Sequence, residues 1–170
     1  MVRILVTCDS ITGHVERLAE VIAEGARSAP DTEVVLKKAG EVTDEDLVSA
    51  DGIVFGSLKY YGSFGPGIGE LFRRMYRMDH DFSHVVGAGF AGSTSAYGGQ
   101  EHVVDNLIHG MLQAGRMIVV GNLSPESGFV GGYVVGEPDE MARRTAHALG
   151  ERVARVAAIM RAARGEVGGD

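Results

Sequence analysis

Two hydrophobic patterns alternate along this chain: short, nearly continuous apolar runs, and longer stretches in which apolar residues recur every three or four positions. The short runs predict strands that are buried on both faces of a sheet, since such strands are apolar almost throughout. We expect five strands: Val2–Thr7, Glu33–Lys37, Ile53–Gly56, Val85–Ala91 and Met117–Val120. The strand Glu33–Lys37 is expected to be only half buried.

The stretches with helical spacing lie between these strands. Apolar residues between Gly13 and Ser28 form one face of a helix, and charged residues form the other. Further helices are expected over Thr43–Ser49, from Pro66 onward, over Gln100–Ala114, and from Pro138 to about Met160. The segment after them, Gly165–Asp170, is expected to be a frayed tail.

This alternation predicts an α/β fold for a single domain, residues 1–164: a doubly wound parallel sheet with right-handed crossovers and helices on both faces. Such a sheet binds ligands at the carboxyl ends of its strands, near the point where the strand order reverses. Three turns rich in hydroxyl groups, glycine or tyrosine follow strands one, three and four at that edge: Asp9–His14, Ser57–Gly65 and Ser93–Gly99.

The first turn joins a buried strand to the start of a helix. The helix N-terminus has unpaired N–H groups and about half a positive charge, so it favours an anion. Ser10 and Thr12 can donate hydroxyl hydrogen bonds to the same anion. The turn contains no Lys or Arg, which favours an uncharged cradle for a phosphomonoester. The alternative is a capped helix only, with Ser10 or Thr12 as its N-cap.

Other phosphate chemistries do not fit this turn. A Walker A loop would need a Gly-Lys-Ser/Thr sequence, which is missing. A phosphatase loop would use Cys8 as nucleophile, but His14 stands where its arginine is needed. A phospho-acceptor site would need an aspartate after strand three, where the sequence is Phe55-Gly56-Ser57.

The other two turns indicate a flat, polar ligand. Tyr60 and Tyr61 of the second turn can stack against a heterocycle, although surface tyrosines at a sheet edge are an alternative. The third turn, Ser93–Gly99, offers hydroxyl groups and backbone amides to the edge of a polar ring, and Tyr97 is a second stacking candidate.

A G-x-G-x-x-G match at Gly87–Gly92 is interpreted as a false positive for a dinucleotide site. The glycines lie within the expected fourth strand, whereas the fingerprint needs them in a turn that opens a helix. We expect them to allow close packing of the backbone.

Composition limits the remaining possibilities. A length of 170 residues suits one domain, and a net charge of −7 argues against general nucleic-acid binding. No apolar run approaches the roughly 20 residues of a membrane span, and the first residues resemble a strand more than a signal peptide. The lone Cys8 suits a reducing cytoplasm. Only His80 and His84 among the six histidines have ligand spacing, so no metal site is expected.

Taken together, the three turns resemble the flavodoxin-like FMN-binding family, and most of all its WrbA-type NAD(P)H:quinone oxidoreductases. The pieces that carry the resemblance are Ser10–Val15, Phe55-Gly56-Ser57 with Tyr61-Gly62, and Ser93-Thr94 with Gly98-Gly99-Gln100-Glu101. The chain departs from that family in Ser57–Tyr61, which replaces Thr-Pro-Thr-Arg-Phe, in Gln113, which replaces a histidine, and in having no Trp.

The resemblance implies a strand order of 2-1-3-4-5 and an enzyme that passes electrons from NAD(P)H through FMN to a quinone or another small acceptor. It also implies a homo-oligomer, a dimer or a tetramer. No catalytic acid or base is required, because the flavin supplies the redox chemistry. The implied phosphate ligands are Ser10, Ile11, Thr12, Gly13, His14 and Val15. The implied flavin contacts are Lys59, Tyr60, Tyr61 and Gly62, with Ser93, Thr94, Ser95, Ala96, Tyr97 and Gly98 along the ribityl chain and ring.

Two alternatives remain open. One is an electron-carrier flavodoxin that serves a protein partner. Such carriers usually surround the flavin with acidic residues, whereas the second and third turns here contain no Asp or Glu and include Lys59. The other alternative is a relative that binds no FMN.

Overall fold

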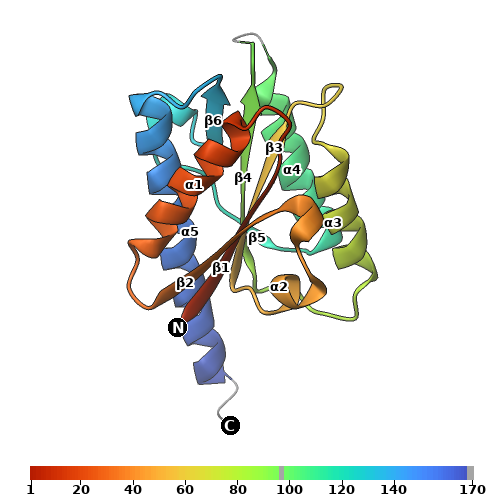
Figure 1. The fold of residues 1–170 in the computed structure, drawn as a ribbon. Coiled ribbons are helices and arrows are strands. Elements are labelled where there is room, and N and C mark those ends of the chain that lie inside the picture. Colours follow the sequence, from red (N-terminus) through yellow and green to blue (C-terminus); the bar gives the residue numbers. More distant parts are fainter. Residues whose placement is uncertain (96–97, 168–170) are drawn as a thin grey trace.

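A parallel sheet with helices on both faces forms the body of the protein in the computed structural model, which describes residues 1–95 and 98–167 (Figure 1). The strand order β2-β1-β3-β4-β5 confirms the expected 2-1-3-4-5 arrangement. The strands are β1 (Val2–Asp9), β2 (Thr32–Lys38), β3 (Gly52–Leu58), β4 (Val86–Ser93), β5 (Ile118–Val119) and β6 (Gly132–Val135).

The fifth place in the sheet is filled by two short strands instead of one. β5 pairs with Val86 and Gly87 of β4, and β6 pairs in parallel with the later part of β4, from Phe90 to Ser93. The expected strand Met117–Val120 is therefore shorter in the structure, and β6 was not expected. Asn122 holds the connection between β5 and β6 in place. Its side-chain amide donates to the carbonyl oxygens of Gly131 at 3.4 Å and Thr145 at 2.8 Å.

Helices cover the two faces of the sheet in pairs, α1 with α5 and α3 with α4 (Figure 1). Successive strand residues point to opposite faces, so Ile4 and Val6 pack under α1 and α5, while Leu5 packs under α3. The helices are α1 (His14–Arg27), α2 (Asp44–Val48), α3 (Pro66–Arg77), α4 (Gln100–Ala114) and α5 (Glu140–Val167), with short 3-10 turns η1 (Ala39–Glu41) and η2 (Pro125–Ser127).

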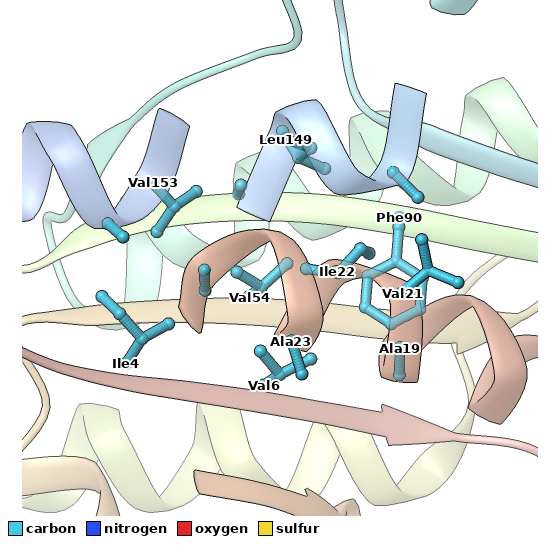
Figure 2. Packing of buried hydrophobic residues seen from close by; sticks show 14 of the residues in the cluster. Ile4, Val6, Ala19, Val21, Ile22, Ala23, Val54, Phe90, Leu149 and Val153 are labelled. Atoms are coloured by element: carbon cyan, nitrogen blue, oxygen red, sulfur yellow. The ribbon is translucent and has the colours of Figure 1, made fainter. Parts of the chain in front are cut away.

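Glycines bring the backbones of α1 and α5 into direct contact. A Cβ atom at Gly25 would lie 2.0 Å from the carbonyl oxygen of His147, and one at Gly150 would lie 1.9 Å from that of Ile22. The side chains of Ile22, Leu149 and Val153 fill the space beside this contact (Figure 2). The position of α1, and so of its N-terminus, is fixed by this packing.

The glycines of the G-x-G-x-x-G match lie inside β4, so the interpretation that they do not open a helix is confirmed. They make room for side chains of neighbouring helices. A Cβ atom at Gly87 would lie 2.5 Å from Sδ of Met111, and one at Gly92 would lie 2.6 Å from Cγ2 of Val15.

The last helix continues beyond the sheet (Figure 1). α5 ends at Val167, whereas the sequence predicts a tail from Gly165 onward; residues 168–170 lie outside the described part. Near this end, the Arg161 guanidinium donates to both carboxylate oxygens of Asp51, at 2.9 and 3.0 Å, which ties α5 to the start of β3. Within the described ranges, none of the helices has the length and apolar character needed to cross a bilayer.

Candidate functional site

The three predicted turns meet at one edge of the sheet. Asp9 of β1 stands beside Ser57 of β3, which in turn stands beside Ala91 of β4, so the three strands end together. A cavity of about 290 Å³ opens there. It is lined by residues of all three turns: Ile11, Thr12, His14, Val15, Leu58, Lys59, Gly92, Ser93, Thr94 and Ser95.

The first turn leaves the N-terminus of α1 open. Its N-cap is Gly13, which has a left-handed φ of 84° and makes no side-chain capping bond. The alternative of Ser10 or Thr12 as N-cap is therefore wrong. Instead, the Ser10 hydroxyl oxygen accepts a hydrogen bond from the Gly13 N–H at 3.2 Å, which closes the turn on itself. Among the residues that the structure describes, no side chain caps this helix end in place of an anion.

Charged side chains lie beside the first turn, although the turn itself has no Lys or Arg. Arg17, one turn into α1, approaches Nδ1 of His14 at 3.1 Å and donates to the Glu137 carboxylate from the segment between β6 and α5. The same His14 nitrogen lies 3.3 Å from the Glu137 carboxylate. This group was not expected from the sequence; the spacing of His14 and Arg17, three positions apart on one helix, was a signal for the contact between those two, whereas no local pattern indicates Glu137.

The second turn is divided between the cavity and the exterior. Leu58 and Lys59 line the cavity. The chain then reverses over Tyr60–Ser63, with backbone hydrogen bonds of 2.8 and 2.9 Å between its two ends. Tyr61 (φ 48°) and Gly62 (φ 84°) both have left-handed backbones, as the central residues of a type I′ turn do.

The two tyrosines of this turn stand outside the cavity lining. The Tyr61 side chain is 93% exposed and meets the half-exposed Tyr60 ring edge to face, with centroids 4.8 Å apart. Asn106 of α4 holds the turn, because its side-chain amide donates to the Ser63 hydroxyl at 3.3 Å. The structure thus leaves both aromatic rings exposed and outside the lining of the cavity, and their stacking on a heterocycle stays a prediction.

Beneath the second turn, polar groups support the strand ends. The buried Ser57 hydroxyl accepts from the Gly65 N–H at 2.7 Å and donates to the Leu58 carbonyl at 2.8 Å. The Asp9 carboxylate accepts from the Gly67 N–H at 2.8 Å, at the first turn of α3. Asp9 therefore stabilises α3 and does not line the cavity.

The third turn is built around Ser93. Its hydroxyl oxygen accepts from the Ser95 N–H at 3.1 Å, and its carbonyl accepts from the Gly136 N–H at 2.9 Å. A Cβ atom at Gly98 would lie 2.3 Å from this hydroxyl oxygen, so only glycine fits there. The buried Gln100 donates to the Ser95 carbonyl at 3.3 Å. The expected ligands Ala96 and Tyr97 lie outside the described residues.

Two titratable groups, the buried Cys8 and the half-buried Tyr133, stay protonated at neutral pH. Burial, followed by the charges of Glu16 and Asp9, raises the pKa of the Cys8 thiol to about 12, so it offers no thiolate nucleophile. Burial, followed by the charges of Glu101 and Asp105, raises the pKa of the Tyr133 phenol to about 12.

Comparisons with known proteins agree with this fold. A protein named flavodoxin from Aquifex aeolicus is 30% identical over 171 residues, covering 94% of this chain and 89% of its own length. One named NAD(P)H dehydrogenase (quinone) from Paraburkholderia phymatum is 34% identical over 142 residues, covering 71% of each. No protein-family model matches the chain.

A solved structure shows the same architecture. A flavodoxin, WrbA-like protein from Agrobacterium tumefaciens has a TM-score of 0.72 at 24% identity, with 94% of this chain and 99% of that one covered. The sheet order and the cavity at its switch point therefore define a flavodoxin-like fold. The chain belongs to the flavodoxin-like family, whose cofactor is FMN.

Proposed function

We propose that this protein is an FMN-dependent oxidoreductase that passes electrons from NAD(P)H to a quinone or another small acceptor. The observation that carries the proposal is the cavity of about 290 Å³ in which all three turns meet, at the uncapped N-terminus of α1. The relatives named NAD(P)H dehydrogenase (quinone) support the reaction class.

The residues of this edge fit FMN. The open helix end, with hydroxyl groups of Ser10 and Thr12 beside it, suits a phosphate. The Nε of Arg17, which has no hydrogen-bond partner among the described residues, is a further donor close by. We assign the phosphate to Ser10–Val15, the ribityl chain and ring to Ser93–Gly98, and the outer face of the flavin to Lys59–Gly62.

The chain's own residues bind and orient the cofactor in this proposal. Ser93 fixes the third turn from both its hydroxyl and its carbonyl, which holds that turn against the cavity. The chemistry is supplied by bound FMN, which exchanges electrons with NAD(P)H and with the acceptor. We assign no catalytic acid or base.

Flavin binding is the first test. Full-length protein purified without added cofactor is expected to be yellow, with a flavin absorption spectrum, or to quench FMN fluorescence when FMN is added to the apoprotein. Colourless protein that leaves FMN fluorescence unchanged contradicts the proposal.

Turnover is the second test, and it separates an enzyme from an electron carrier. Steady-state oxidation of NADH or NADPH with benzoquinone should depend on enzyme concentration and on FMN. A protein that binds FMN but shows no oxidation without a separate reductase is an electron-carrier flavodoxin. The Aquifex relative named flavodoxin makes this the second candidate.

We also propose that the protein acts as a homo-oligomer, a dimer or a tetramer, in the cytoplasm. Large side chains exposed on helices α3 and α4, Tyr76 (75%) and Leu112 (47%), support a contact between copies. Light scattering after gel filtration should give a mass of two or four times 18.0 kDa, and a mass of 18.0 kDa would contradict this assembly.

A further inference from the structure

Arg17 has a buried donor with no acceptor. Its Nε is shielded from solvent and has no hydrogen-bond partner among the described residues. Nη2 of the same guanidinium already faces His14 and the Glu137 carboxylate. Since a buried unpaired donor is unfavourable, the position of this group points to an acceptor that binds beside it.

The guanidinium lies against the phosphate-type turn itself. A Cβ atom at Gly13 would be only 3.3 Å from Nη1 of Arg17, so the absence of a side chain at Gly13 lets the cation reach the turn. The backbone N–H of Arg17 donates to the Gly13 carbonyl at 3.0 Å, which fixes the spacing between the two residues.

The partner that now holds Arg17 is weakly bound. The Glu137 side chain is 63% exposed and that of Arg17 is 41% exposed, and ion pairs in such surroundings stabilise little. A phosphate dianion carries more charge than a carboxylate and suits the fork of an arginine. A phosphate can therefore compete with Glu137 for the same guanidinium.

We propose that Arg17 is a phosphate-binding residue of this site and that Glu137 is its exchangeable counter-ion. In the free protein, Glu137 holds the guanidinium beside Gly13. When a phosphomonoester occupies the turn, Arg17 donates to its oxygens and the pair with Glu137 is released. The inference rests on the proposed FMN function and adds a charged group to an otherwise uncharged cradle.

The two residues are expected to act in opposite directions. Arg17→Gln removes a charged donor and should weaken FMN binding about 10-fold or more. Glu137→Gln removes a competing acceptor and a repelling charge, so it should strengthen FMN binding several-fold. Riboflavin, which lacks the phosphate, should bind both variants as it binds the original protein, within about twofold.

The test is fluorescence titration of the full-length apoprotein with FMN and with riboflavin. Arg27→Gln is the matched control: it makes the same charge change on an exposed residue at the far end of α1, about 15 Å along the helix. At ordinary ionic strength this distance exceeds the screening length of about 10 Å, so both affinities should stay unchanged.

Each outcome decides the inference. It is supported if Arg17→Gln lowers the FMN-to-riboflavin preference while Glu137→Gln raises it. If Arg17→Gln changes both ligands equally or neither, or if Glu137→Gln weakens FMN as much as Arg17→Gln does, the pair is a structural clamp and the inference is overturned.

Two further results keep the test decisive. If Arg17→Gln does not fold, judged by circular dichroism, Arg17→Lys decides: it keeps the charge but loses the fork, and it should weaken FMN only, by less than tenfold. If the original protein binds neither flavin, the proposed function fails and this inference fails with it. If the original protein binds FMN but the preference of the Arg17 variant is unchanged, only the inference fails.

Discussion

The carboxylate of Asp9 accepts a hydrogen bond from the backbone N–H of Gly67 at 2.8 Å, and so joins the end of β1 to the first turn of α3. The carboxylate also lies close to Gly65, where a Cβ atom would be 2.4 Å from the same oxygen, so position 65 has no room for a side chain. Asp9 thus fixes the distance between the first and second turns from below the cavity.

Asp9→Ala should destabilise the protein by about 1–2 kcal/mol, because it leaves the Gly67 N–H without its acceptor and removes a negative charge from a helix N-terminus. Chemical denaturation measures the change in the free energy of unfolding. Asp9→Asn keeps an acceptor oxygen and should lose less. Equal losses from the two variants would show that the hydrogen bond is not the source of the stability.

Gly25→Ala should destabilise the fold by about 2–3 kcal/mol, because the added Cβ would lie 2.0 Å from the His147 carbonyl oxygen and α1 must move away from α5. Gly40→Ala is the matched control, since a Cβ atom there meets nothing within 4 Å. Thermal unfolding compares the two. A Gly25 variant as stable as the Gly40 variant would contradict the close packing of the two helices.

We expect the protein to lose stability in acid because of the lowered pKa of Asp46. Burial alone would raise its pKa, but hydrogen bonds from Lys37 at 2.6 Å and from Thr43 outweigh that effect and lower the pKa to about 2. The folded pKa lies below the unfolded value of 3.8, so this stabilisation is complete above about pH 4 and is lost as pH falls towards 2.

The expected size of this effect is about 2 kcal/mol. Urea denaturation of the original protein and of Asp46→Asn, at several pH values, should show a difference in unfolding free energy that shrinks between pH 4 and pH 2. Glu24→Gln, on an exposed residue of α1, should show no such convergence. A difference that stays constant down to pH 2 would rule out the lowered pKa.

Replacing Tyr61 should change the affinity for FMN without lowering the stability of the fold. Because its side chain is 93% exposed and its φ is 48°, Tyr61→Gly should leave the protein equally stable or stabilise it by up to about 1 kcal/mol. If the ring stacks on the flavin as proposed, FMN affinity should fall about fivefold. Phe129→Gly, at another exposed aromatic residue with a left-handed φ (65°), is the control. Unchanged FMN affinity would show that Tyr61 does not contact the flavin and is only an exposed residue at the sheet edge.

Most of the fold could be predicted because its strands are short, nearly continuous apolar runs separated by helices of clear periodicity. The fifth strand was expected over Met117–Val120 and is found as the shorter β5, but β6 beside it could not be predicted, since it has only four residues and begins with Gly132. The four residues of β6 are too few for a periodic signal. The shared position of β5 and β6 depends on pairing with β4, which is a long-range contact.

The three turns of the candidate site could be predicted, but its charged group could not. Glu137 lies 120 positions from Arg17, and no local pattern connects them. The choice of N-cap also differed, because Gly13 adopts a left-handed backbone that serine or threonine would adopt at a cost. The hydroxyl group of Ser10 then bonds within the turn instead of capping the helix.

The direct backbone contact of α1 with α5 has a consequence for ligand affinity. Gly25 and Gly150 leave no space between the two helices, so α1 cannot turn about its axis or slide without a collision. The end of α1 that faces the cavity therefore has one orientation before any ligand arrives. A phosphate that binds there meets a preorganised set of donors, and little conformational entropy is lost on binding.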